Sequence, residues 1–85
     1  MKVTMRLGEP FWRAAGQRET ILVLGEGATV SDALAALVQQ HPSLAPELNN
    51  GEIKPALFIN DEAASPESLL PEAATVHIVW PVSGG

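Results

Sequence analysis

Residues 29–38 read Thr-Val-Ser-Asp-Ala-Leu-Ala-Ala-Leu-Val, and this stretch decides the fold. Thr29, followed three residues later by Asp32, has the pattern of a capping box, in which each side chain bonds a backbone amide at the start of a helix. Pro42 cannot continue a helix, so the helix should end near His41. The stretch predicts one amphipathic helix of about three turns, packed across a sheet. Its apolar residues recur at the spacing of one helix face: Val30, Ala33, Leu34, Leu37 and Val38.

Apolar segments on either side of this helix predict four strands. Residues 1–7 alternate apolar and polar side chains, which is the period of a half-buried strand. The third strand should end in an Asn60-Asp61 turn, and the fourth should carry Val76, Ile78 and Trp80 on one face. The four predicted strands are residues 1–7, 20–24, 56–60 and 75–80.

The first connection carries two aromatic residues. Residues 11–16 should form either an irregular helical turn ended by Gly16 or an aromatic loop. We expect Phe11 and Trp12 to cover one end of the core; an exposed recognition patch is the alternative.

Two further connections are less regular. Residues 42–55 contain three prolines and an Asn-Asn-Gly sequence, which predicts a surface loop with one short turn. Residues 65–68 read Ser-Pro-Glu-Ser, the pattern of a capped helical turn with proline at its first position. This turn is expected to place Leu69 and Leu70 in the core.

The predicted order is strand, strand, helix, strand, short turn, strand, which indicates an α+β roll. With the first and last strands side by side, a right-handed crossover places the helix against one face of a mixed sheet of four to five strands. This is the β-grasp, or ubiquitin-like, fold. We assign residues 1–80 to the β-grasp domain and residues 81–85 to a flexible C-terminal tail.

Composition excludes several functional classes. The chain has 85 residues, five Lys and Arg against ten Asp and Glu, a formal net charge of −5 and no cysteine. A nucleic-acid-binding protein needs a basic face, and disulfides, thiol nucleophiles and cysteine-bound metals need cysteine. The sequence contains no apolar run long enough to span a membrane. We expect a cytoplasmic protein without nucleic-acid, membrane or metal partners, whose acidic rim suits basic protein surfaces.

The side chains do not predict an active site. His41 should lie at the helix C-terminus and His77 on the outer face of a strand, far from each other in the chain. The sequence has no Ser/His/Asp spacing, phosphate-binding loop or metal-ligand cluster. We therefore expect a protein that is not catalytic alone.

The Gly84-Gly85 pair suggests chemistry at the main chain. Glycine has no Cβ, so two glycines can extend through a channel too narrow for other residues. A carboxylate of Gly85 could then reach a reactive centre in a partner enzyme. It would have to be activated first, for example by adenylation with ATP, and such an enzyme would stabilise the phosphate charge with Mg²⁺ and cationic groups.

The residues before this pair suit threading into a partner. Pro81 and Val82 should stiffen the exit from the domain, and Ser83 is small enough to follow the glycines. Trp80 has two equally good interpretations: a partner contact, because aromatic residues often anchor interfaces, or a cover on the core.

The chain resembles the MoaD/ThiS family of ubiquitin-like sulfur carriers, particularly the small subunit of molybdopterin synthase. It departs from the family in having Pro71-Glu72-Ala73-Ala74 where an acidic Asp-Gly-Asp turn is usual, and Trp80-Pro81 where Pro-Pro is frequent. The resemblance rests on the order of the elements and on four matching segments: Pro81-Val82-Ser83-Gly84-Gly85, Arg13 with Gly16, residues 27–34 and residues 58–62.

The resemblance implies a role in molybdenum cofactor biosynthesis. A ubiquitin-activating-type adenylyltransferase would adenylate Gly85 with Mg-ATP, and a persulfide sulfur donor would convert it to a thiocarboxylate. The tail would then enter the large subunit of molybdopterin synthase and donate its sulfur to cyclic pyranopterin monophosphate. The chain would be a non-catalytic subunit and co-substrate that binds no cofactor itself.

Three alternatives remain open. The carrier could serve thiamine, cysteine or tRNA thiolation. The same tail could join the chain to lysines as a ubiquitin-like protein modifier. The domain could also be a β-grasp interaction module without chemistry at its terminus.

Overall fold

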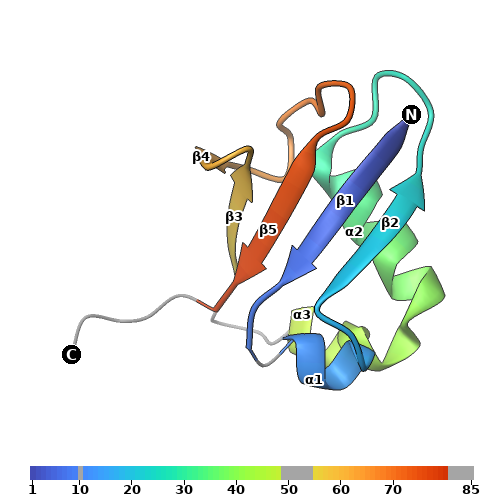
Figure 1. The fold of residues 1–85 in the computed structure, drawn as a ribbon, viewed down its shortest axis with the longest axis vertical. Coiled ribbons are helices and arrows are strands. Elements are labelled where there is room, and N and C mark those ends of the chain that lie inside the picture. Colours follow the sequence, from blue (N-terminus) through green and yellow to red (C-terminus); the bar gives the residue numbers. More distant parts are fainter. Residues whose placement is uncertain (10, 49–54, 81–85) are drawn as a thin grey trace.

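A computed structural model describes residues 1–9, 11–48 and 55–80. Within them a five-stranded mixed sheet has the order β2-β1-β5-β3-β4, and helix α2 crosses one of its faces (Figure 1). The first and last strands are parallel, and the other pairs are antiparallel. This confirms the predicted β-grasp fold. The elements are β1 (Lys2–Leu7), α1 (Phe11–Ala15), β2 (Glu19–Val23), α2 (Val30–Gln40), the 3₁₀ helix η1 (Pro42–Leu44), α3 (Ala45–Leu48), β3 (Ala56–Ile59), β4 (Glu62–Ala64) and β5 (Thr75–Val79).

Helix α2 begins and ends where the sequence predicts. The Asp32 amide donates to the Thr29 hydroxyl at 3.3 Å, and the Thr29 amide donates to the Asp32 carboxylate at 2.9 Å. This reciprocal capping box satisfies two amides that have no partner within the helix. At the other end the His41 amide donates to the Leu37 carbonyl at 2.8 Å. Both ends therefore depend on local signals.

The core lies between α2 and the inner face of the sheet. On β1 the predicted alternation is confirmed, because Val3, Met5 and Leu7 are buried while the intervening side chains face outward. Because side chains alternate along a strand, the same strands present a second, outer face that no described element covers. The largest fully buried side chains are Phe11, Met5, Leu22, Leu37, Leu44, Ile78, Val3, Val30 and Val76.

Helix α1 is the helical turn predicted after the first strand. The Gly16 amide donates to the Trp12 carbonyl at 2.9 Å, and Gly16 has φ 82°, the left-handed conformation that ends helices. Phe11 is fully buried at one end of the core, and Trp12 is partly buried beside it. The expectation that both residues cover the core is confirmed.

Two predicted connections were wrong in detail. Residues 42–48 form η1 and α3 instead of a loop, and Leu44 is fully buried. Proline favours the first positions of a helix, so Pro42 both ends α2 and begins η1. Residues 49–54 of the predicted loop lie outside the described part of the chain.

The segment at residues 65–68 is a turn and not a helix. The Ser68 amide donates to the Ser65 carbonyl at 3.0 Å. The carbonyls of Pro66 and Ser68 accept from the amides of Ser31 and Val30, in the first turn of α2. These long-range bonds take carbonyls that a helix would need for itself.

The extended chain after this turn also corrects the expected burial. Leu70 is buried, but Leu69 points outward and is 69% exposed. Successive side chains of an extended segment point to opposite sides, so the two leucines cannot both enter the core.

The β3-β4 hairpin contains the predicted Asn60-Asp61 turn. Both residues have positive φ, 48° and 72°, as two-residue hairpin turns require. The Asn60 side chain accepts from the Thr75 amide at 3.0 Å, and the Asn60 amide donates to the Thr75 carbonyl at 2.9 Å. These bonds tie the hairpin to the start of β5. Strand β4 has only three residues, which was too short to predict individually.

Ala73 is strained in the turn before β5. Its φ is 57°, where a residue with a Cβ loses about 1–2 kcal/mol relative to the right-handed conformation. We expect Ala73→Gly to raise the free energy of unfolding by roughly 0.5 kcal/mol, because relief of strain exceeds the extra entropy of glycine in the unfolded chain. Urea denaturation measures the change.

The adjacent alanine provides a matched control. Ala74 is 1% exposed and does not have positive φ, so Ala74→Gly should destabilise by about 1 kcal/mol. Equal destabilisation by the two substitutions would show that Ala73 is not strained.

Candidate functional site

The end of β5 leads toward the tail. Strands β1 and β5 are parallel, so they end at the same edge of the sheet, where α1 follows β1 (Figure 1). The Gly8 amide donates to the Ile78 carbonyl at 2.8 Å, and a Cβ on Gly8 would lie 3.2 Å from that oxygen. This close backbone approach fixes the direction of β5 as it reaches Trp80.

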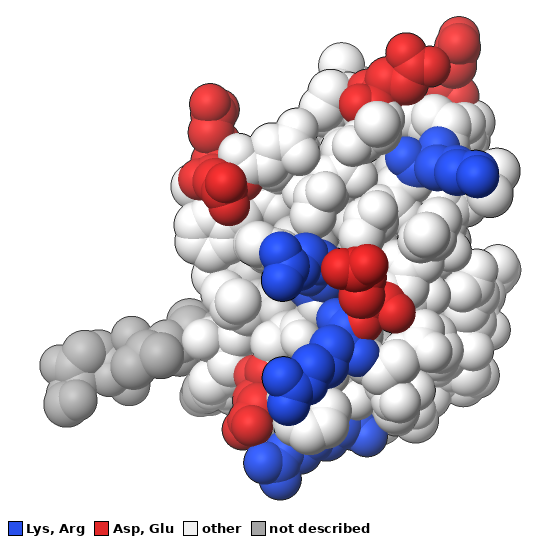
Figure 2. All heavy atoms as spheres, viewed as in Figure 1, with Lys and Arg blue, Asp and Glu red and all other residues white. Residues whose placement is uncertain are grey.

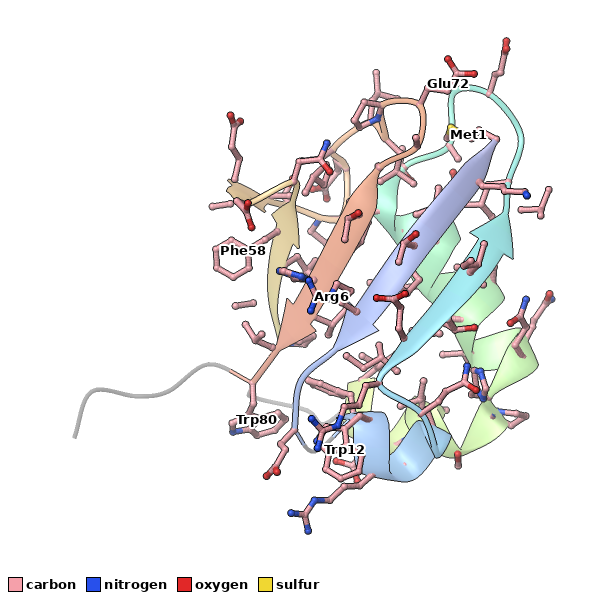
Figure 3. The ribbon with its side chains drawn as sticks, viewed as in Figure 1. Met1, Arg6, Trp12, Phe58, Glu72 and Trp80 are labelled. Atoms are coloured by element: carbon pink, nitrogen blue, oxygen red, sulfur yellow. The ribbon has the colours of Figure 1, made fainter. Side chains whose placement is uncertain are left out.

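Trp80 is the last described residue before the tail. Its side chain is half-buried, and its ring centroid lies 6.0 Å from that of Phe11, with the planes tilted by 47°. The ring therefore packs on the end of the core and retains exposed surface (Figure 3). The predicted tail residues, Pro81, Val82, Ser83, Gly84 and Gly85, lie outside the described part of the chain.

Beside the end of β5, where the chain leaves the domain, two arginine side chains lie against a tryptophan ring. The guanidinium carbon of Arg18 lies 4.6 Å from the centroid of a Trp12 ring, and that of Arg13 lies 5.3 Å away. Arg13 also pairs with Glu9 at 3.2 Å, and across β1 and β2 Arg6 pairs with Glu19 at 3.7 Å. This cluster was not predicted from the sequence. Its only signal was that three of the five basic residues occur between positions 6 and 18.

The histidines do not form a catalytic centre. His41 caps α2 on the helix side of the sheet, and its Nε2 lies 3.4 Å from the side-chain nitrogen of Gln17. His77 lies on the outer face of β5, between Arg6 and Phe58 on the neighbouring strands. Among the described residues, neither histidine hydrogen-bonds a hydroxyl group, and no three acidic or histidine side chains gather as metal ligands.

The surface hollows do not change this conclusion. One, of about 240 Å³, is lined by Arg6, Asn60, Asp61, Thr75 and His77. Another, of about 320 Å³, lies between the β3-β4 hairpin and residues 68–71. In neither hollow does a lining hydroxyl group hydrogen-bond a histidine or a carboxylate of the described residues. Across the described ranges, no helix is long and apolar enough to cross a membrane.

Comparison with known proteins decides the family. Residues 7–85 match the family described as the ThiS family. The chain belongs to the ThiS family. The match includes Gly84-Gly85 and therefore extends beyond the described domain to the tail. The family assignment confirms the resemblance found from the sequence and establishes a ubiquitin-like protein of the sulfur carrier and modifier type.

Solved structures agree with the ThiS assignment. The small archaeal modifier protein 1 of Haloferax volcanii is 30% identical, with complete coverage of both chains and a TM-score of 0.87. A putative molybdopterin converting factor subunit 1 from Pyrococcus furiosus is 22% identical over 96% of this chain and 99% of that one, with a TM-score of 0.80, which supports the fold alone.

A third similar chain comes from a complex of subunits 1 and 2 of molybdopterin-converting factor from Helicobacter pylori. It is 20% identical, with complete coverage of both chains and a TM-score of 0.66, so it supports the fold alone. No curated protein matches the chain.

Proposed function

We propose that this ThiS-family chain is a sulfur carrier and the small subunit of a molybdopterin synthase. In this proposal the working group is the carboxylate of Gly85, either as the encoded terminus or after removal of any residues beyond it. The observation that carries the proposal is that the family match runs through Gly84-Gly85. The described domain supports it through β5, whose end at Trp80 leads directly into residues 81–85.

The chemistry begins with activation. The Gly85 carboxylate attacks the α-phosphorus of ATP, forms an acyl adenylate and releases pyrophosphate. A protein persulfide then attacks the carbonyl carbon, and AMP leaves as an acyl disulfide forms. A second thiol cleaves the sulfur–sulfur bond, which leaves the thiocarboxylate on Gly85 and a disulfide on the donor. The chain contains no cysteine, so all of the sulfur must come from outside.

The thiocarboxylate then delivers its sulfur inside the large subunit. We propose cyclic pyranopterin monophosphate as the acceptor. The thiocarboxylate sulfur bonds to it, and water then hydrolyses the resulting thioester, which leaves the sulfur on the acceptor and returns Gly85 to a carboxylate. The chain's own part is steric: Ser83, Gly84 and Gly85 have little or no side chain to obstruct a narrow channel. Mg-ATP is used by the activating enzyme in the cytoplasm, and we propose no cofactor for this chain.

Intact mass spectrometry tests the carrier function. After incubation with Mg-ATP, a persulfide donor and a ubiquitin-activating-type adenylyltransferase from the same organism, the mass should increase by about 16 Da, with the change on Gly85. Oxidation of Met1 or Met5 adds a similar mass, so fragmentation must locate the change and a sample without ATP must lack it. An unchanged mass, with an enzyme active on another carrier, would contradict the proposal.

The acceptor is tested with the thiocarboxylated protein. Adding the large subunit and cyclic pyranopterin monophosphate should remove the extra mass and form molybdopterin. Discharge only with a thiazole precursor, a cysteine precursor or tRNA would instead assign the carrier to another pathway.

The second candidate function is protein modification. The 30% identity to a small archaeal modifier protein favours it. A modifier would join Gly85 to lysines through an isopeptide bond and would appear as conjugates of higher mass in cell extracts. Both functions begin with the same adenylation step.

A further inference from the structure

The positive charge of this acidic protein is concentrated beside the exit from β5. We call Arg6, Trp12, Arg13 and Arg18 the arginine patch. Figure 2 shows the basic side chains of this face gathered mainly over the half nearer α1 and the exit, with acidic side chains prominent at the opposite edge. The patch includes three arginines, and Glu9 and Glu19 are paired with two of them. It therefore keeps one net positive charge within a chain of net charge −5.

The two ion pairs leave the arginines available. The side chains of Arg6 and Glu19 are 58% and 56% exposed, and those of Arg13 and Glu9 are 64% and 63% exposed. Exposed pairs are weak because water screens them, so either arginine can exchange its glutamate for a partner's carboxylate. Arg18 forms no ion pair with any described residue.

Trp12 holds two of these arginine side chains, Arg18 and Arg13, against its ring. Its ring lies 4.6 Å from the Arg18 guanidinium and 5.3 Å from that of Arg13. A guanidinium stacked on an aromatic face loses side-chain freedom but keeps its edge donors free for carboxylates. The Leu7 amide donates to the Arg18 carbonyl at 2.8 Å, which fixes the backbone beneath this side chain. Arg13 and Arg18 are therefore restrained in position, and their N–H groups remain free to bind an anionic group.

The patch is joined to the end of β5 by backbone and ring contacts. The Trp12 amide donates to the Gly8 carbonyl at 3.1 Å, and the Gly8 amide donates to the Ile78 carbonyl on β5. Phe11, next to Trp12, packs against Trp80. Trp12 and Trp80 lie at the same end of the sheet in Figure 3. A partner that receives the tail would therefore cover the patch at the same time.

From this placement we propose that the arginine patch docks on an acidic surface beside the tail channel of the adenylating enzyme. This inference rests on the proposed function, but it requires only adenylation and does not depend on the sulfur acceptor. It also replaces the expectation that the acidic rim meets basic partner surfaces, because the arginine patch with its two paired glutamates has a net positive charge. Opposite charges would steer the tail toward the channel and mainly raise the rate of association.

Pyrophosphate exchange with varied carrier concentration tests the proposal. For Arg18→Glu we expect kcat/KM at low ionic strength to fall about tenfold, through KM and not kcat, because reversed charge repels the partner surface. Lys2→Glu is the matched control: it makes the same change in net charge, but at the end of β1 away from the exit, and should alter kcat/KM less than about twofold. Thermal unfolding verifies that both variants fold. If Arg18→Glu does not fold, Arg18→Gln is used in its place.

The dependence of kcat/KM on ionic strength is a second test. It would be the same for the unmodified protein and for Arg18→Glu if Arg18 had only a structural role. Raising ionic strength should lower kcat/KM for the unmodified protein and raise it for Arg18→Glu, since salt screens attraction and repulsion alike. Equal effects of Arg18→Glu and Lys2→Glu, or no salt dependence, would overturn the docking proposal while leaving the carrier function intact. No exchange with the unmodified protein, by an enzyme active on another carrier, would instead overturn the carrier function and the docking proposal together.

Discussion

Adding one alanine after Gly85 should abolish thiocarboxylate formation without affecting the fold. The added residue moves the carboxylate beyond the position at which ATP is attacked, and misplacement of a reacting group by even about 1 Å can cost on the order of 100-fold in rate. We therefore expect a loss of at least about 100-fold in the rate of adenylation. Pyrophosphate exchange with purified enzyme measures it and avoids proteases that trim the added residue.

A matched control shows whether the loss comes from the position of the C-terminal carboxylate or from a change in the domain. One alanine added before Met1 makes the same change in composition and should leave exchange unaltered, since only the Gly85 end enters the active centre. Both extended proteins should unfold at the same temperature as the original. If the chain extended after Gly85 were adenylated at the normal rate, the position of the Gly85 carboxylate would not determine the reaction and this prediction would be wrong. If neither the original nor the extended chain were adenylated, by an enzyme active on another carrier, an interaction module would become the better interpretation.

The elements that were predicted correctly have signals contained within a few residues. The α2 helix carries its own cap at Thr29 and its own stop at Pro42, and β1 shows its two faces through alternation alone. Once the first and last strands are placed side by side, as β1 and β5 are, the handedness of the crossover puts the helix on one face of the sheet without knowledge of side-chain packing.

The errors occurred where distant segments decide the structure. Ser65–Ser68 has the local sequence of a helical turn, yet its carbonyls bind amides of α2 more than thirty residues away. Leu44 is buried although the surrounding prolines and polar residues indicate a surface loop.

The candidate site also has one part that local sequence predicts and one part that depends on distant segments. The tail could be predicted because its chemistry lies in the sequence of residues 81–85 itself. The arginine patch could not, since Arg18 reaches Trp12 only after α1 ends and the chain turns into β2. No periodic pattern links a short helix with the residue before the next strand.

Phe11→Ala should produce the largest loss of stability. Phe11 is fully buried, contacts Trp80 and closes the end of the core next to the exit. Truncating a buried phenylalanine costs about 3–5 kcal/mol, because apolar contacts are lost and a cavity remains. Small domains have only about 5–15 kcal/mol in total, so much of the stability depends on this ring. Urea denaturation followed by tryptophan fluorescence measures the change.

Two further variants serve as controls for Phe11→Ala. Phe11→Leu keeps most of the volume and should cost less than about 1.5 kcal/mol, which gives a folded protein if Phe11→Ala does not fold. Val23→Ala removes an apolar side chain that is 76% exposed on the outer face and should change stability by less than about 0.5 kcal/mol. A cost for Phe11→Ala as small as that for Val23→Ala would mean that Phe11 does not close the core, and that Trp80 is positioned by something other than this contact.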